Sequence, residues 1–347
     1  MRIVQLLADM QYGDAITDNA LALKAAIESF GAESDIYAEN IHPSLSAKVK
    51  NIADYRPADC VIHHFAIGSS VNGFVKKLDC RKILVYHNIT PSYFFKGYNL
   101  KSELSCLEAR VQLAECSGVY DAALAVSEYN RTELEKLGFK NTGVLPILYD
   151  YSRAAVFPRE SKTTNILFLG RIAPNKCQQD VIRTFYYYKK YFNKEANLYI
   201  AGSYGGMEKY LSELIHLTES LPLQDVYFTG RLSYEQMYKL YSNTDLFLCM
   251  SEHEGFCVPL AECMHYGIPI LAYSAAAIPE TLADSAVLFS KKDYFAVAAM
   301  MNEILTNSEL KNKIVNSQKR RLEDFSEEKI RTGLFEIMKS CGIMKDD

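Results

Sequence analysis

The chain has 347 residues, a net charge of −4 and 49% hydrophobic residues. This length exceeds one ordinary hydrophobic core and predicts two globular domains, while the charge balance argues against nucleic acid as a partner. No apolar stretch is long enough to span a membrane, and we expect no signal peptide. Nine cysteines without paired C-x-x-C spacing indicate a reduced, cytoplasmic protein.

The first half of the chain alternates short apolar runs with helical patterns. Residues 2–7 predict a buried strand, residues 8–18 a loop with Gly13, and residues 20–30 a helix. The unit lacks the glycine-rich dinucleotide fingerprint, so Gly13 either makes the turn or brings its N–H near a phosphate or an acceptor. Further strands are expected at residues 34–37, 59–64, 82–87, 122–126 and 143–146, with helices at 101–116 and 130–137. This alternation predicts a parallel sheet covered on both faces.

Histidines end two of these expected strands. His87 closes the strand at 82–87, and Pro91 prevents a helix from starting directly after it. His63 and His64 end another strand. Ligands of parallel sheets bind outside the carboxyl ends of the strands. His87 is therefore a candidate site residue on a loop, and a structural role fits about equally well.

The second half repeats the alternation after an aperiodic linker at residues 149–164. Strands are expected at residues 165–169, 197–200, 226–229, 246–250, 268–272 and 286–289, helices at 178–192 and 206–217, and a capping box from Ser233 to Gln236. We expect domains at residues 1–152 and 153–326. Helices are expected at 292–306, 309–322 and 327–343, and the apolar stripe of the last one predicts that segment 327–347 packs back on the first domain.

Residues 251–282, SEHEGFCVPLAECMHYGIPILAYSAAAIPETL, carry the densest set of candidate site residues. Glu254 and Glu262 are separated by seven residues, and Pro259 suits the first turn of a helix. We expect Glu254 in the preceding loop and Glu262 in the first turn. The N–H groups of residues 257–261 would then face a cleft and suit a phosphate. Carboxylates on both sides of a phosphate site favour sugar or ribose hydroxyls, which predicts a sugar-nucleotide site. The spacing of Glu254 and Glu262 alone is more often that of a capped surface helix.

A charged loop follows the strand expected at 165–169. Arg171 comes directly after Gly170, and Lys176 follows five residues later. Two cations past a strand end can neutralise a diphosphate and stabilise it as it leaves. Solvated surface charges are the alternative, but the Glu254–Glu262 stretch favours the site. No D-x-D motif offers metal ligands at a strand end.

The motifs LGRIAPNK, EHEGFCVPLAECMHYGIPILAY and AIPETL resemble the retaining glycosyltransferases of family 4, which have the GT-B fold. Three motifs in the first half match this family more weakly, namely YGDAITDN, VYHNITP and AVSEYNRTEL. They resemble bacterial enzymes that build O-antigen and other surface polysaccharides. The resemblance implies an α/β protein with two Rossmann-like doubly wound domains facing a cleft. The N-terminal domain would bind the acceptor, and the C-terminal domain would bind the nucleotide sugar.

The resemblance also assigns roles to matching residues. Arg171 and Lys176 would hold the donor diphosphate, Glu254 would contact the donor sugar, Glu262 would bind the ribose, and His87 would lie near the donor sugar. The other implied donor contacts fall on Gly13, Thr229, Gly230, Arg231, Leu232, Gly255, Phe256, Cys257 and Val258.

The acceptor is expected to contact Asp14 and His87. In the first loop Gly13 is followed by Asp14, where the family often has two adjacent glycines.

The implied activity is retaining, front-face transfer of a hexose with a catalytic set of His87, Glu254, Arg171 and Lys176. It needs no metal or other cofactor. A GDP-mannose-like donor and a saccharide or polyprenyl-linked saccharide acceptor are favoured. A UDP-sugar donor, a nucleotide-sugar 2-epimerase and a non-catalytic nucleotide-sugar binder are the alternatives. Peripheral contact with the inner membrane face is suggested by an aromatic and basic cluster of Phe94, Phe95, Lys96, Lys76, Lys77, Arg81 and Lys82.

Overall fold

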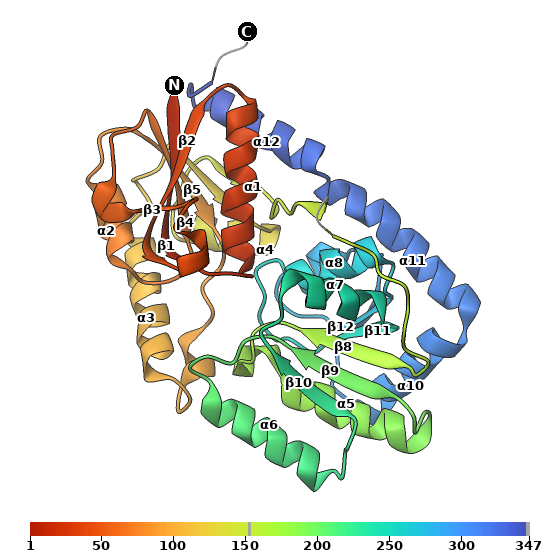
Figure 1. Ribbon diagram of the computed structural model, residues 1–347. Coiled ribbons are helices and arrows are strands. Elements are labelled where there is room, and N and C mark those ends of the chain that lie inside the picture. The colour runs from red at the N-terminus through yellow and green to blue at the C-terminus, as the bar shows by residue number, and fades with distance from the viewer. Residues whose placement is uncertain (152–153, 345–347) are drawn as a thin grey trace. The chain divides into compact units, whose positions relative to one another are not determined.

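The computed structural model describes residues 1–151 and 154–344, which divide into two compact units (Figure 1). The first unit comprises Met1–Ser92, Lys101–Asp150 and Phe325–Asp347, and the second comprises Tyr93–Leu100 and Tyr151–Asp324. The boundary expected between residues 152 and 153, and the expected end of the last segment at residue 347, lie outside the described residues. All nine cysteines are free thiols.

The first unit contains a seven-stranded parallel sheet in the order β3-β2-β1-β4-β5-β6-β7. Val4 and Leu6 pack with Val71 on one face, whereas Leu7 packs with Ala20 on the other, so both faces are covered as predicted. Its strands are β1 (Arg2–Met10), β2 (Glu33–Ile41), β3 (Lys50–Asn51), β4 (Cys60–Phe65), β5 (Arg81–Tyr86), β6 (Ala122–Ala125) and β7 (Thr142–Val144). Its helices are α1 (Ala15–Ser29), α2 (Ser70–Lys76), α3 (Leu100–Ala114), α4 (Glu128–Lys136) and α12 (Glu327–Ser340).

The C-terminal helix α12 packs on α1 of the first unit. The ring of Phe335 meets Phe30 edge-on at a centroid distance of 5.2 Å. Arg331 Nη2 donates to Ser29 Oγ at 2.6 Å. The packing predicted from the apolar stripe of this helix is confirmed.

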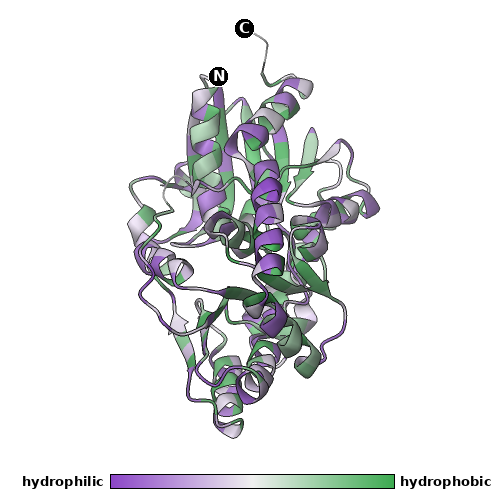
Figure 2. Ribbon diagram, turned by 90° about the vertical axis from the view of Figure 1, so that its right-hand side faces the viewer, coloured by the Kyte–Doolittle hydropathy of each residue, from purple (hydrophilic) through white to green (hydrophobic). Residues whose placement is uncertain are grey.

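The second unit contains a six-stranded parallel sheet in the order β10-β9-β8-β11-β12-β13. Figure 1 shows α5 and α6 on one face of this sheet and α7 and α8 on the other, and its strands are largely apolar in Figure 2. The strands are β8 (Asn165–Leu169), β9 (Asn197–Ala201), β10 (Val226–Gly230), β11 (Leu246–Cys249), β12 (Ile270–Tyr273) and β13 (Val287–Phe289). The helices are α5 (Gln178–Tyr191), α6 (Glu208–Ser220), α7 (Tyr234–Ser242), α8 (Val258–Tyr266), α9 (Ile278–Leu282), α10 (Tyr294–Thr306) and α11 (Ser308–Leu322).

Both sheets have the strand order of doubly wound Rossmann folds, and the predicted fold class is confirmed. In each sheet the order reverses at one point, between β1 and β4 and between β8 and β11. Ligands of such folds bind outside the carboxyl ends of the strands at this switch point. The capping box predicted at Ser233 and Gln236 opens α7. Within the described part of the chain, no helix is both long and apolar enough to cross a membrane.

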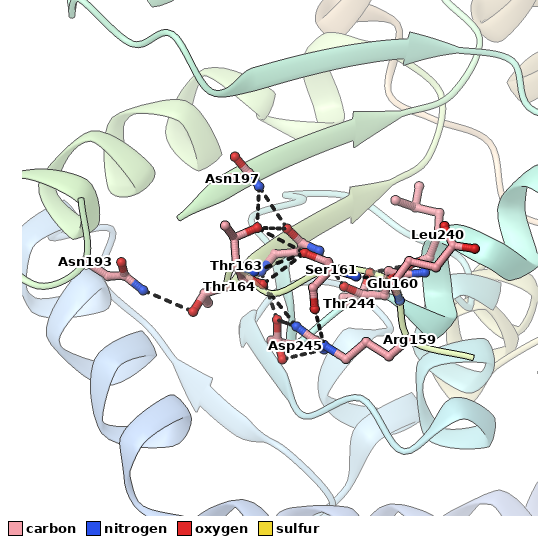
Figure 3. Close-up of polar contacts among 12 residues, drawn as sticks. Arg159, Glu160, Ser161, Thr163, Thr164, Asn193, Asn197, Leu240, Thr244 and Asp245 are labelled. Atoms are coloured by element: carbon pink, nitrogen blue, oxygen red, sulfur yellow. Dashed lines mark hydrogen bonds and ion pairs between the residues drawn. The ribbon is translucent and has the colours of Figure 1, made fainter. Parts of the chain in front are cut away.

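The segment that leads into β8 is held by polar contacts (Figure 3). Arg159 donates two hydrogen bonds of 2.8 Å to the carboxylate of Asp245, and Asp245 Oδ2 also accepts the backbone N–H of Asn165 at 2.9 Å. Asn243 Oδ1 accepts the backbone N–H of Ser161 at 2.9 Å. These contacts tie the segment to the start of β11 and so fix the position from which β8 begins.

Candidate functional site

Two loops leave the carboxyl ends of β8 and β11, the strands that flank the switch point of the second unit. The loop after β8 ends in a short 3-10 helix, Pro174–Lys176, and the loop after β11 leads to α8. Lys176 Nζ donates to Glu254 Oε2 at 2.5 Å. Glu254 is buried. The structure thus brings together two residues that the sequence predicted for one site, and it joins them directly.

Asn175 cross-links the same two loops. Its side-chain amide donates to the backbone oxygen of His253 at 3.1 Å, and its own backbone oxygen accepts the N–H of Glu252 at 2.9 Å. From the other side, Thr281 Oγ1 donates to the backbone oxygen of Phe256 at 2.8 Å. The sequence analysis missed Asn175 and Thr281, because a side chain that bonds to the backbone of a distant loop leaves no local pattern.

The ion pair sets the charge available at the switch point. Burial of Lys176 acts to lower the pKa of its ammonium group, but the Glu254 carboxylate outweighs burial and raises the pKa overall. Lys176 therefore stays charged at neutral pH. An anion that approached Lys176 would share its ammonium group with Glu254. A sugar attached to that anion would lie next to the Glu254 carboxylate.

Glycines allow the loop after β8 to lie close to the loop after β9. Gly202 has a φ of +143°, and a Cβ added to it would lie 2.0 Å from the backbone oxygen of Gly170. The backbones are also bonded, since Gly170 N–H donates to Ala201 at 2.9 Å and Ile172 N–H donates to Ser203 at 2.8 Å. Gly202 therefore positions the exposed Arg171, although the sequence analysis did not select it.

Helix α8 begins at Val258, after Cys257 in a left-handed conformation with a φ of +70°. No side chain caps this helix start. Pro259 lies in the first turn as predicted, but Glu262 is the fifth residue of the helix and lies in the second turn. The first-turn prediction for Glu262 was wrong, because the first turn is complete at Ala261.

Glu262 is buried against α7. Its Oε2 atom accepts the hydroxyl of Tyr241 at 2.7 Å, and Tyr241 is itself buried. A buried carboxylate that accepts a hydrogen bond of this kind has a defined direction. Contact between Glu262 and a ribose stays a prediction.

The implied donor contacts at residues 229–232 lie at the end of β10 and directly after it. Gly230 has a φ of +65°, and its backbone oxygen accepts the N–H of Gly202 at 3.0 Å. Thr229 and Leu232 border a cavity of about 440 Å³. The cavity is also lined by Glu160, Ser161, Asn165, Tyr199, Gln236, Lys239, Leu240 and Asn243.

The loop after β1 places Gly13 and Asp14 at the start of α1. Gly13 has a φ of +67°, which fits its predicted role in the turn. Asp14 is the N-cap of α1, and its Oδ2 atom accepts the N–H groups of Ile16 at 3.1 Å and Thr17 at 3.2 Å. The helix therefore begins five residues earlier than predicted, because Asp14 caps it.

His87 follows β5 directly and is only 8% exposed. Its backbone N–H donates to Phe65 at 2.9 Å, so the residue extends the ladder between β4 and β5. Its ring is nearly parallel to that of His64 with centroids 5.1 Å apart, and the two rings meet edge to edge with 2.8 Å between His64 Nδ1 and His87 Nε2. Burial lowers the pKa of His87 to about 3. The imidazole is therefore neutral at physiological pH.

A family model matches residues of the second unit. The family model of the glycosyl transferases group 1 matches residues 152–321. This part of the chain belongs to that family. The matched residues include Arg171, Lys176, Glu254 and Glu262, so the two joined loops lie in the group 1 domain.

Sequence relatives of this chain include Escherichia coli proteins described as serotype-specific mannosyltransferase WbdA. Two are 27% identical over 144 residues, which is 41% of this chain and 17% of each relative. A third is 30% identical over 99 residues, 28% of this chain and 12% of the relative. The matched region therefore spans less than a fifth of these relatives.

Solved structures match this chain over nearly its whole length. Anabaena HepE, described as in complex with UDP and glucose, has a TM-score of 0.76 at 15% identity, covering 98% of this chain and 100% of that one. A glycosyltransferase from Rickettsia africae has a TM-score of 0.75 at 14% identity, with 99% of each chain covered. WaaG, described as a glycosyltransferase involved in lipopolysaccharide biosynthesis, has a TM-score of 0.72 at 11% identity, covering 99% and 100%. These similarities confirm the GT-B fold.

We expect Glu262→Ala to weaken binding of a nucleoside diphosphate that carries no sugar. The loss of a charge-assisted hydrogen bond should cost about 1.5–3 kcal/mol, or roughly 10- to 150-fold in Kd. Isothermal titration with GDP and UDP measures it. Tyr241→Phe is the matched control, because it removes the partner of Glu262 and keeps the carboxylate. Equal affinity in Glu262→Ala and wild type would contradict ribose binding.

The buried histidines of the first unit should make the stability of the protein depend on pH. Burial lowers the pKa of His63 and of His87 to about 3, from an ordinary value of 6.5. The unfolded chain therefore binds more protons below pH 6.5, and stability is lost as the pH falls from 6.5 towards 3. Each histidine contributes about 1.4 kcal/mol per pH unit well inside this window.

Urea unfolding at pH 7, 6, 5 and 4 measures this dependence. His63→Gln should reduce the slope, because it removes one of these two buried imidazoles. A free energy of unfolding that stays constant between pH 6.5 and pH 4 would show that these histidines are protonated in the folded protein.

Proposed function

We propose that the protein is a retaining glycosyltransferase that moves a hexose from a nucleotide-diphosphate sugar to a saccharide acceptor. The observation that carries this proposal is the Lys176–Glu254 pair at the switch point, within residues matched by the group 1 family. A cation next to a carboxylate suits a ligand that joins a phosphate to a sugar. The uncapped start of α8 adds positive partial charge on the same side of the sheet.

The proposed reaction is a front-face displacement. The acceptor hydroxyl forms a bond to the anomeric carbon while the bond from that carbon to the leaving phosphate oxygen breaks on the same side. The departing diphosphate keeps the electron pair of the broken bond and takes the proton of the hydroxyl. Arg171 and Lys176 would stabilise its growing negative charge. The proposed reaction requires no nucleophile from the protein.

Mannose with a guanine nucleotide is the favoured donor. The E. coli relatives are described as mannosyltransferases, which supports mannose. HepE, by contrast, is described with UDP and with UDP-glucose, so a UDP-sugar is the alternative. A nucleotide-sugar 2-epimerase is a further alternative, which would release an altered sugar nucleotide without any acceptor. The Arg171 and Lys176 cations together with the Glu254 and Glu262 spacing argue against it.

A polyprenyl-linked saccharide is the favoured acceptor, reached by peripheral contact with the inner membrane face from the cytoplasm. An exposed apolar stripe of Leu104, Leu107 and Val111 on α3 supports this proposal. The basic cluster expected from the sequence supports it less, since Lys76 pairs with Glu115 and Arg81 pairs with Asp121. Phe95 of that cluster is buried.

Thermal shift with GDP-, UDP- and dTDP-sugars tests the donor. A ligand at 100 times its Kd stabilises the folded state by about 2.7 kcal/mol. We expect GDP-mannose to raise the Tm and free mannose to leave it unchanged. A shift with none of the nucleotides would contradict the proposal, and a shift with UDP-sugars alone would replace GDP-mannose by the alternative donor.

We also propose that transfer needs no divalent cation, because Arg171 and Lys176 offer the charge that a metal would supply. Activity should survive EDTA. Activity abolished by EDTA and restored by Mg²⁺ would overturn this part of the proposal.

A further inference from the structure

Lys292 connects several segments at the carboxyl edge of the sheet in the second unit. It lies in the turn between β13 and α10. Its ammonium group donates to Asp180 Oδ2, in the first turn of α5, at 2.8 Å and to Glu252 Oε1, in the loop after β11, at 2.7 Å. The same Nζ atom lies 4.7 Å from the centre of the Tyr273 ring, at the end of β12. One side chain from the turn after β13 therefore contacts segments that end or follow β8, β11 and β12.

The two carboxylates lie on the segments that carry the Lys176–Glu254 pair. Asp180 comes four residues after Lys176, in the turn that begins α5. Glu252 comes two residues before Glu254, and its backbone N–H bonds to the loop of Lys176 at 2.9 Å. Lys292 thus holds both segments close to the pair, without contacting either member of the pair in a hydrogen bond that it needs for itself.

The bridge from Lys292 to the two acids is a charged one. The side chain of Lys292 is 15% exposed and that of Asp180 is 8% exposed. Burial acts to lower the pKa of Lys292, but the hydrogen bonds to Asp180 and Glu252 outweigh burial and raise the pKa overall. The ammonium group therefore stays charged at neutral pH, and the bridge persists under the conditions in which the protein works.

The two acids differ in what else holds them. Asp180 Oδ1 also accepts the hydroxyl of Tyr294 at 2.8 Å and lies 3.7 Å from Arg183 Nη1. The Asp180 carboxylate is thus fixed from several sides, whereas that of Glu252 is half-exposed and is held by Lys292. The bridge therefore acts mainly on the loop after β11, which carries Glu254.

We propose that Lys292 is a positioning residue, which holds the loop after β11 against α5 so that Glu254 meets Lys176 in one fixed geometry. The inference rests on the proposed function for the reaction that this geometry serves. Lys292 acts through the loop and not on the nucleotide sugar, because its ammonium group is already shared by two carboxylates.

The geometry is tested without substrate by ¹³C NMR of the Glu254 carboxyl carbon in the full chain. We expect Glu252→Ala and Lys292→Met to shift this signal in the same direction, because both release the loop from the bridge. A direct effect of the lost charge would have opposite signs, since one variant removes a negative charge and the other a positive one. Opposite shifts, or no shift in either variant, would overturn the inference.

Kinetics test the consequence for transfer. We expect kcat to fall about tenfold or more in Glu252→Ala and in Lys292→Met, because a small displacement of groups around the reacting centre is costly. The Kd for GDP or UDP should change by no more than about threefold, since the geometry matters most when the leaving group gains charge. A wild-type kcat in both variants would overturn the positioning role.

Glu252→Ala keeps the test decisive where Lys292→Met fails to fold. Glu252 is half-exposed, and its removal leaves Lys292 paired with Asp180, so the Tm should change by no more than about 2 °C. Glu235→Ala is the matched control, because it breaks another exposed lysine–glutamate pair of the second unit, with Lys239 at 2.6 Å. It should leave both the Glu254 signal and kcat unchanged, and an equal loss of kcat in this control would overturn the inference.

These readouts separate the two proposals. A Glu254 signal that shifts in the same direction in both variants, together with no transfer from any donor by the wild type, would support the bridge and overturn only the proposed function. Transfer by the wild type with an unchanged kcat and an unchanged Glu254 signal in Glu252→Ala would overturn only the bridge.

Discussion

Lys176→Met is expected to lower both stability and transfer. The substitution leaves Glu254 as a buried carboxylate without its cation, and breaking such a pair costs about 3–5 kcal/mol. It also removes a cation that would face the leaving diphosphate, so kcat should fall at least about 10²-fold. Denaturant unfolding and steady-state kinetics with the donor identified by thermal shift measure the two effects.

The double variant Lys176→Met, Glu254→Gln separates them. Neutralising Glu254 removes the uncompensated charge, so most of the lost stability should return. Transfer should stay lost, because neither the cation nor the carboxylate is present. A double variant that recovered both stability and transfer would show that the pair is structural only.

Gly202→Ala is expected to be among the most damaging single methyl additions in the second unit. The new Cβ would lie 2.0 Å from the Gly170 oxygen and 2.6 Å from its carbonyl carbon, both of which are backbone atoms. The loop that carries Arg171 must therefore move. Steric overlap and the unfavourable φ together should cost about 3 kcal/mol or more. Nucleotide affinity should fall at least about tenfold.

Gly205→Ala is the matched control on the same loop. The atom nearest to its added Cβ is 3.8 Å away, which is ordinary contact. Its stability should therefore change by no more than about 0.5 kcal/mol. Similar losses in both variants would mean that the loop tolerates no side chain anywhere, and the close approach of Gly170 and Gly202 would not be the cause.

The sequence predicted the parallel sheets because buried parallel strands are continuous apolar runs between helical patterns. It also predicted the approximate places of Arg171, Lys176 and Glu254, since residues past strand ends gather at one edge of a sheet. It did not predict that Lys176 and Glu254 pair. They are 78 positions apart in the sequence, and only the reversal of strand order between β8 and β11 brings them together.

Local backbone geometry and strand pairing account for the other differences between the predicted and the observed site. Glu262 was placed one turn too early, because the left-handed conformation of Cys257 sets the start of α8 and cysteine gives no sign of it. Gln5 lies in an apolar run, and its 2.8 Å contact with His64 joins two residues that are 59 positions apart in the sequence. The close approach of Gly202 to Gly170 likewise depends on the pairing of β8 with β9, which a single sequence does not encode locally.

The measurement that tests the central claim most directly follows the fate of the nucleotide sugar. Purified protein is incubated with the stabilising donor, with and without a panel of mannose- and glucose-containing oligosaccharides, and the products are identified by mass spectrometry and NMR. We expect release of the free nucleoside diphosphate, and this release should be faster when an acceptor is present. We also expect an extended oligosaccharide whose new linkage keeps the anomeric configuration of the donor. The double variant Lys176→Met, Glu254→Gln should release no nucleoside diphosphate. A donor that is bound but never consumed, or a sugar nucleotide returned with altered stereochemistry and no transfer, would contradict it.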